Sequence, residues 1–210
     1  MWLADWRRSV AALYAEVLKL AELDPSVAHR SWRESRDGLF RTHPQSPVPR
    51  ADRDGYEARY FDYDPALRFT VPIEPAPPPE PGALALELPN SGADSLAFSR
   101  VGRVEFSFAD GRRGLSVFWM AGYAGGLFIP FRDATNGHET YGAGRYLLDA
   151  AKSADLGGDP AAGTLILDFN FAYQPSCAFD PRWACPLAPP ENRLDLAIRA
   201  GERLIGEPAA

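Results

Sequence analysis

The chain has 210 residues, of which 46% are hydrophobic and 24% are charged, and it contains 20 prolines. This composition is typical of a globular protein and excludes a fibrous or largely disordered chain. The formal net charge of −6 disfavours nucleic acid or an anionic membrane surface as the main partner.

The N-terminal segment, residues 1–38, is predicted to be helical. Apolar residues recur at spacings of three and four from Trp2 to Leu20, which predicts an amphipathic helix whose apolar stripe packs on the core. Charged residues within that pattern exclude a signal peptide and a membrane span, so a cytoplasmic location is expected. Asp24, followed by a proline, is a typical start of a second helix, which is expected to be mostly solvated and to end with the segment.

Two proline-rich segments are expected to lack helices and strands. Residues 40–49, FRTHPQSPVP, contain three prolines, which remove backbone donors and fix backbone angles. Residues 71–82, VPIEPAPPPEPG, have the composition of a polyproline spacer and are expected to serve as a connector.

Beyond the spacer the period of the apolar residues becomes two, which predicts a β core over residues 83–200. Asp110-Gly111 separates two alternating runs and predicts a hairpin. The expected fold is a single α+β domain over residues 1–210 that is mainly β. In it, N-terminal helices pack against an antiparallel β-sandwich or a partly closed barrel.

A second hairpin is predicted around Asn136-Gly137, the preferred pair for a two-residue type I′ turn. In that register Arg132, Glu139 and Tyr141 share one face. Turn chemistry does not require such side chains there. We therefore interpret this hairpin as one wall of a candidate site.

The segment TLILDFNFAY, residues 164–173, is predicted to be a central strand because it is almost entirely apolar on both faces. Asp168 and Asn170 are expected to point the same way, since side chains alternate along a strand. An unpaired buried charge is costly, so both residues need partners. We interpret them as the second wall of the site.

The C-terminal part leaves two questions open. Residues 193–205 are compatible with a helix or with a closing strand. Cys177 and Cys185 are too few for a disulfide scaffold, and the three histidines are scattered. Two partly buried thiols are favoured over a zinc site, with a short-loop disulfide as an alternative, and no metal or other cofactor is expected.

Three blocks of the sequence together resemble domain-of-unknown-function family 1684, which comprises bacterial and archaeal proteins. The blocks are PFRDATNGHETYGAGRYL, LDFNFAYQPSCAF and CPLAPPENRLDLAIRAGE, and the resemblance extends to SPVP and YFDYDPALRF. The matching motif residues are Arg132, Asp133, Thr135, Thr140, Tyr141, Gly144, Arg145, Tyr146, Asp168, Asn170, Tyr173, Cys177, Cys185, Glu191 and Asn192.

The resemblance spans most of the chain and implies a shared fold and a shared polar cluster, but no substrate. In similar tails a proline often interrupts the segment around Leu196, which mildly favours a strand there. This chain lacks that proline.

The polar residues of the two walls define the candidate site. Guanidinium, carboxylate, amide and phenol groups together can hold a small polar or anionic ligand, which is the function we expect. The ligand-binding candidates are Arg132, Asp133, Glu139, Tyr141, Arg145, Asp168, Asn170 and Tyr173.

Two other functions are compatible with the same residues. Asp168 and Glu139 could be the acid and base of a hydrolase-like enzyme, although the sequence lacks every diagnostic catalytic motif considered. The residues could instead form a buried polar network in a structural or interaction module. The sequence predicts no particular oligomeric state.

Overall fold

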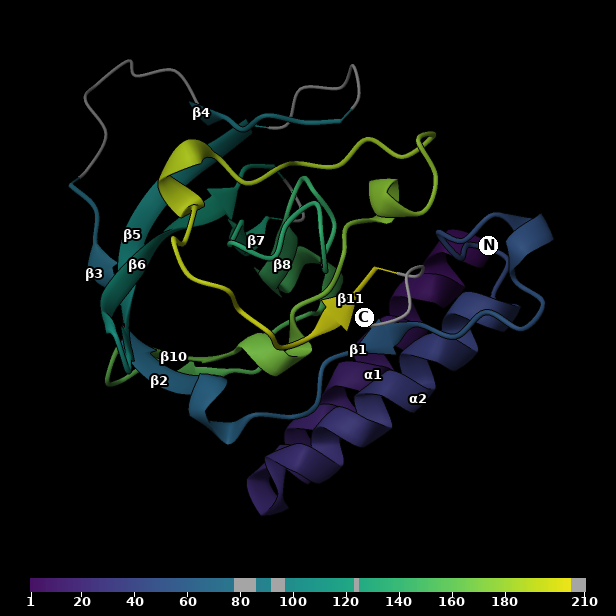
Figure 1. The fold of residues 1–210 in the computed structure, drawn as a ribbon, viewed down its shortest axis with the longest axis horizontal. Coiled ribbons are helices and arrows are strands. Elements are labelled where there is room, and N and C mark those ends of the chain that lie inside the picture. The colour runs from purple at the N-terminus through teal and green to yellow at the C-terminus, as the bar shows by residue number, and fades with distance from the viewer. Residues whose placement is uncertain (78–85, 92–96, 123–124, 205–210) are drawn as a thin grey trace.

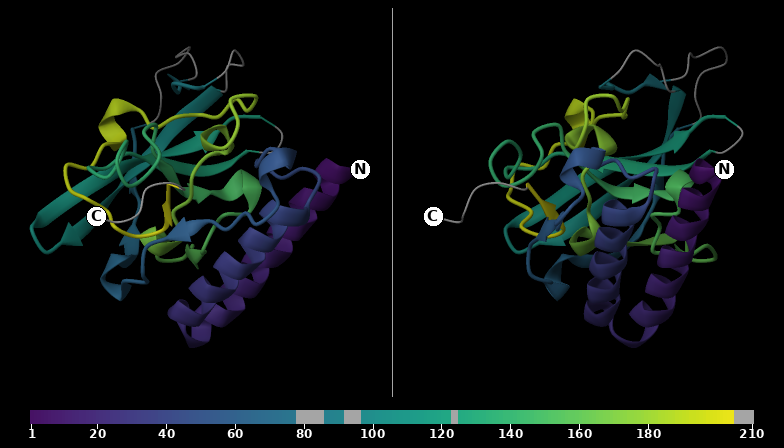
Figure 2. Two further views of the ribbon diagram at one scale, coloured as in Figure 1. Left: turned by 45° about the vertical axis from the view of Figure 1, so that its right-hand side comes forward. Right: turned by 90° about the vertical axis from the view of Figure 1, so that its right-hand side faces the viewer.

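The computed structural model describes residues 1–77, 86–91, 97–122 and 125–204. Two helices run side by side along one flank of the molecule, and strands form the rest (Figures 1 and 2). The α+β class with N-terminal helices packed on antiparallel sheets is confirmed. The sheets are sandwich-like, and the strands of the described residues do not close into a barrel.

The two helices are α1 (Trp2–Leu23) and α2 (Pro25–Thr42). Asp24 separates them and caps α2, because its Oδ1 accepts the backbone N–H of Ser26 at 2.8 Å. Two expectations are wrong in detail. Helix α2 continues past residue 38 and buries Trp32 and Phe40, so it is not mostly solvated; Trp2, at the start of the apolar stripe, is 59% exposed.

The strands of the described residues form three antiparallel sheets. The largest has the order β3-β5-β6-β7-β8, with β4 also paired to β5; a second has the order β2-β10-β9, and β1 pairs with β11. The bounds are β1 (Arg59–Tyr60), β2 (Arg68–Pro72), β3 (Glu74–Pro75), β4 (Leu86–Glu87), β5 (Ala97–Phe108), β6 (Gly111–Met120), β7 (Gly126–Phe131), β8 (Arg145–Asp149), β9 (Gly158–Asp159), β10 (Thr164–Asp168) and β11 (Glu202–Arg203).

Two core clusters cover the two faces of the largest sheet, and a third, smaller one packs Phe40 of α2 against Val48, Tyr56 and Ala58. Phe118 and Phe128 pack against residues of the two helices. Val117 and Ile129, their neighbours along β6 and β7, pack against β2 and β10. This alternation is the period of two that the sequence shows, and it explains why the central strands are apolar on both faces.

The hairpin at Asp110-Gly111 is confirmed, since Phe108 at the end of β5 pairs with Gly111 at the start of β6. The predicted spacer is only partly a connector, because Glu74–Pro75 pairs with β5. The rest of that spacer, from residue 78, lies outside the described residues, as does the first part of the run that begins at residue 84.

The register predicted around Asn136-Gly137 is wrong. Phe131 pairs with Arg145, so residues 132–144 form a loop between β7 and β8. Within it, Asp133 Oδ1 accepts the backbone N–H of Thr135, and Thr135 O accepts the N–H of Thr140. These local bonds give the backbone an alternative to strand pairing.

Two further expectations for the C-terminal half are corrected. Strand β10 ends at Asp168, and a 3-10 turn (Phe169–Phe171) follows, so Asp168 and Asn170 do not alternate along one strand. Residues 193–201 form neither a helix nor a long strand and run extended across the 132–144 loop, where Leu194 N donates to Arg132 O at 2.8 Å. No helix in the described part of the chain has the length and apolar character needed to cross a bilayer.

Candidate functional site

Arg145 and Asp133 form a fully buried ion pair. Arg145 Nη2 lies 2.7 Å from Asp133 Oδ2, and both side chains are 0% exposed. The guanidinium also donates to the backbone oxygens of Ile198 and Ala200. Through these bonds Arg145 ties β8 to the C-terminal segment, and through Asp133 it ties β8 to the 132–144 loop.

Asp168 and Asn170 fix a second contact between distant segments. Asp168 is buried and accepts hydrogen bonds from Arg68 Nη1 at 3.2 Å and from the backbone N–H of Asn170. The Asn170 amide forms two bonds of 2.8 Å with the backbone N–H and O of Asp64. Burial raises the pKa of Asp168, opposed by the bonds from Asn170 and Arg68.

Glu139 lies apart from Asp168, at the outer side of the loop, in an exposed pair with Arg199 at 3.0 Å. The two carboxylates therefore belong to separate ion pairs, Glu139 with Arg199 and Asp168 with Arg68. Tyr141 donates to Cys177 Sγ at 3.8 Å, while Arg132 contacts the C-terminal segment through its backbone.

The eight candidate residues take part in several separate sets of contacts. Of the two cavities considered next, one is lined by Tyr173, and neither is lined by any of the other seven. Tyr173 donates to Asp149 Oδ2 at 3.0 Å. Within the described residues, no group of three or more potential ligand side chains is placed to hold a metal ion.

A cavity of about 520 Å³ lies between α1, α2 and the segments 151–154 and 173–185. Four basic side chains line it, those of Arg7, Arg8, Arg36 and Lys152, and its described lining contains no aspartate or glutamate. Apolar side chains form much of the remaining wall, among them Leu3, Trp6, Val10, Phe40 and Trp183. We call it the basic cavity.

Arg36 is the most constrained cation of the basic cavity. Its side chain is 12% exposed, and Nη2 lies 2.9 Å from Oε2 of the buried Glu202. The guanidinium carbon lies 4.2 Å from the ring centre of Phe40 and 4.8 Å from that of Tyr173. Burial is the largest single effect on the pKa of Arg36 and would lower it, but the Glu202 carboxylate and the neighbouring tyrosines together raise the pKa.

Arg36 and Tyr14 each have a hydrogen-bond donor without an acceptor among the described residues. Arg36 Nε is buried and has no partner among the described residues. The Tyr14 hydroxyl accepts a bond from Trp32 Nε1 at 3.1 Å, and its proton has no acceptor among the described residues. Burial raises the pKa of Tyr14 to about 12, so it stays protonated at neutral pH.

Lys152 lies at the opposite wall and is half-exposed. Its Nζ is 3.1 Å from Asp149 Oδ2, the oxygen that also accepts the Tyr173 hydroxyl. Asp149 and Glu202 are therefore the acids that balance Lys152 and Arg36, and neither lines the cavity. Arg7 and Arg8 are exposed and have no acidic partner among the described residues.

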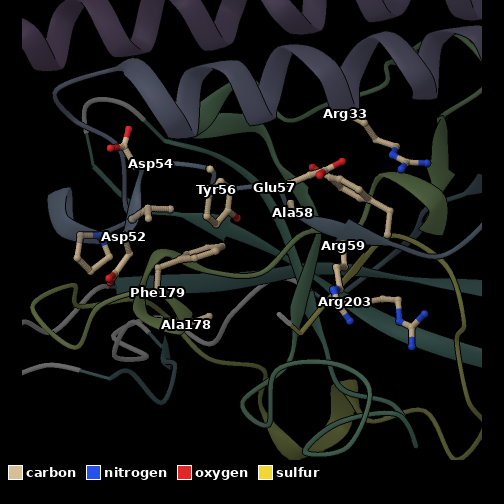
Figure 3. A pocket seen from close by; sticks show the side chains of 14 residues that line it. Arg33, Asp52, Asp54, Tyr56, Glu57, Ala58, Arg59, Ala178, Phe179 and Arg203 are labelled. Carbon is tan, nitrogen blue, oxygen red and sulfur yellow. The ribbon is translucent and has the colours of Figure 1, made fainter. Parts of the chain in front are cut away.

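A second hollow of about 790 Å³ lies on the other side of α2 and mixes both charges (Figure 3). Arg33, Arg59 and Arg203 gather at one end, and Asp52 and Asp54 lie at the other. The rings of Tyr56 and Phe179 lie between the two ends (Figure 3). Acidic and basic side chains both line this hollow, so it shows no preference for one sign of ligand charge. We call it the mixed-charge groove.

The sequence reasoning missed Arg36 because α2 was expected to be solvated. A signal was present: His29, Trp32, Arg36 and Phe40 follow one another at spacings of three and four and so share one helix face. A single cation in an otherwise aromatic stripe needs a partner or a ligand.

Comparisons with known proteins were made on sequence and on structure. A family model described as "Protein of unknown function (DUF1684)" matches residues 56–203. No protein with a curated description matches the chain. The solution NMR structure of an uncharacterized protein from Haloarcula marismortui has 34% sequence identity and a TM-score of 0.59, with coverage of 83% of this chain and 91% of that one.

The matched region begins after α2. Lys152, Tyr173 and Cys185 of the basic cavity therefore lie inside it, whereas Arg36 and the residues of α1 precede it.

Proposed function

The chain belongs to the DUF1684 family of proteins of unknown function, and on that premise we propose that it binds a small amphipathic anion in the basic cavity. The ligand has one acidic head group and an apolar body, as in a medium-chain or aromatic carboxylate. Such a ligand falls within the class of small polar or anionic molecules expected from the sequence. The proposed site lies elsewhere, and only Tyr173 is shared with the candidate residues.

The charge of the lining carries the proposal. A chain with a formal charge of −6 lines this cavity with four basic and no acidic side chains among the described residues. The carboxylates that balance Arg36 and Lys152 lie behind the lining. A ligand in the cavity meets cations and hydrogen-bond donors first, which favours an anion.

The donors support a buried head group near Arg36. Arg36 Nε and the Tyr14 hydroxyl both have a proton to donate, and neither proton has an acceptor within the described part of the chain. The Phe40 and Tyr173 rings hold the guanidinium in place, so binding needs little reordering of this side chain. A carboxylate there would satisfy donors that are costly to leave unpaired.

The apolar wall supports an apolar body. Trp6 and Trp183 line the cavity on α1 and on the 173–185 segment, together with Val10 and Phe40. Burying apolar ligand surface against them stabilises the complex by about 25 cal/mol per Å². The cavity volume of about 520 Å³ is within the usual range for small-ligand sites.

Octanoate and octylamine test the proposal, because they share an apolar chain and differ in the charge of the head group. By isothermal titration calorimetry we expect octanoate to bind with a dissociation constant on the order of 0.1 mM, from roughly 0.5 kcal/mol per non-hydrogen atom. Octylamine should not bind. Equal binding of both compounds, or binding of neither, would contradict the proposal.

A cytoplasmic location and the absence of nucleic acid or membrane partners stay predictions. They rest on the charged residues of the first helix and on the negative net charge.

A further inference from the structure

The two cysteines lie against each other at the ends of a short loop. The backbone N–H of Cys177 donates to Cys185 Sγ at 3.3 Å, so the Cys185 sulfur lies directly beside Cys177. Both are free thiols. Cys185 is 4% exposed, whereas Cys177 is partly open to solvent. The pair therefore has one accessible sulfur with a second sulfur directly behind it.

The backbone holds the two sulfurs differently. Both backbone polar groups of Cys185 are bonded to Ser91. The Cys185 N–H donates to Ser91 Oγ at 2.9 Å, and the Cys185 O accepts the N–H of Ser91 at 3.0 Å. Cys177 sits in a single 3-10 turn (Ser176–Ala178). A small movement of this 3-10 turn changes the distance between the two sulfurs, while Cys185 stays in place.

We propose that Cys177 and Cys185 form a redox-active dithiol, in which a hydroperoxide oxidises Cys177 and Cys185 then resolves the product as a disulfide. This inference does not rest on the proposed ligand, although Cys185 also lines the basic cavity. Cys177, which is partly exposed, attacks the hydroperoxide, and the buried Cys185 resolves the product.

The surroundings of Cys177 favour its thiolate. The Cys185 thiol is the main cause, and the hydroxyls of Ser91 and Tyr141 add to it, the latter 3.8 Å away. Against the opposing effect of burial they lower the pKa of Cys177 from 9.0 to about 6. The same contact and burial raise the pKa of Cys185. At neutral pH Cys177 is therefore the thiolate that attacks first, whereas Cys185 keeps its proton until Cys177 has been oxidised.

The chemistry balances in two steps. The Cys177 thiolate attacks the terminal oxygen of the hydroperoxide, the S–O bond forms and the O–O bond breaks, and the alkoxide takes a proton from solvent to leave as an alcohol. Cys185 then gives up its proton and its sulfur attacks the sulfenic sulfur; the S–S bond forms, the S–O bond breaks, and the leaving hydroxide takes up a proton to become water. Two thiols are oxidised and one hydroperoxide is reduced.

Intact-mass spectrometry of the reduced protein after treatment with hydrogen peroxide tests the proposal. The wild type should lose two hydrogen atoms, and peptide mapping should place the new bond between Cys177 and Cys185. C185S and C177S are a matched pair. C185S should give a sulfenic acid at Cys177 that dimedone traps, and C177S should give neither a disulfide nor an adduct.

Alkylation of the wild-type protein keeps the test valid if either variant fails to fold. Iodoacetamide should modify Cys177 about tenfold faster than Cys185 at pH 7. The pH profile for Cys177 should have its midpoint near 6 rather than near 9.0. A profile centred near 9.0, trapping at Cys185 instead of Cys177, or no loss of mass with peroxide would overturn the proposal.

Discussion

Replacing Arg145 with alanine is expected to lower the free energy of unfolding by about 3–5 kcal/mol, because it leaves Asp133 as an unpaired buried charge. The pair is 2.7 Å apart and both side chains are 0% exposed, so water does not compensate for the lost cation. The variant also removes donors to Ile198 O and Ala200 O. Urea denaturation followed by circular dichroism measures the change.

Arg199→Ala is the matched control for this experiment. Arg199 also joins the 132–144 loop to the C-terminal segment, through Glu139, but its side chain is 64% exposed. Surface ion pairs contribute little to stability, so its urea midpoint should stay close to that of the wild type. The double variant R145A/D133A should be more stable than R145A, since it leaves no buried charge. Similar midpoints for R145A and R199A would refute the structural role of the Arg145 pair.

Removing the Arg36 charge is expected to weaken octanoate binding by about tenfold to a hundredfold, as a hydrogen bond to a charged group contributes about 1.5–3 kcal/mol. Arg36→Met alone would leave Glu202 unpaired in the interior, so the double variant R36M/E202Q is used. Calorimetry with octanoate gives the affinity, and circular dichroism shows whether the variant is folded.

Arg33→Met provides the control on the same helix. Arg33 lies one turn before Arg36 on α2, and it lines the mixed-charge groove instead of the basic cavity. Its guanidinium carbon lies 4.6 Å from the ring centre of Tyr60. The variant removes the same charge and should keep wild-type affinity for octanoate. If R33M and R36M/E202Q weaken binding equally, the effect comes from overall charge and not from the basic cavity.

The fold features that the sequence predicted depend on neighbouring residues. Asp24 before a proline is a local signal for a helix start, and the alternation around Asp110-Gly111 is a local signal for a hairpin. Both are confirmed. The turn at Asn136-Gly137 failed because Asp133 and Thr135 form side-chain and backbone bonds that a preference for a two-residue turn does not include.

The position of a site depends on contacts between distant segments, and periodicity does not reveal these. Asp168 accepts a hydrogen bond from Arg68, and Arg145 donates to the backbone of residues 198–200, so both polar side chains have partners within the fold. The sequence did not indicate Arg36 as a site residue, although it lines the basic cavity. Its ion pair with Glu202 joins α2 to β11 across most of the chain, and no local pattern indicates that pairing.

The indole N–H signals of the protein in a ¹H–¹⁵N NMR titration test the ligand site most directly. Trp6 and Trp183 line the basic cavity, whereas Trp119 lies outside it and is 43% exposed. Adding octanoate should shift the Trp6 and Trp183 signals in a saturable way and leave Trp119 unchanged, and octylamine should shift none of them. Unchanged Trp6 and Trp183 signals at saturating octanoate, or equal shifts at Trp119, would contradict binding in the basic cavity.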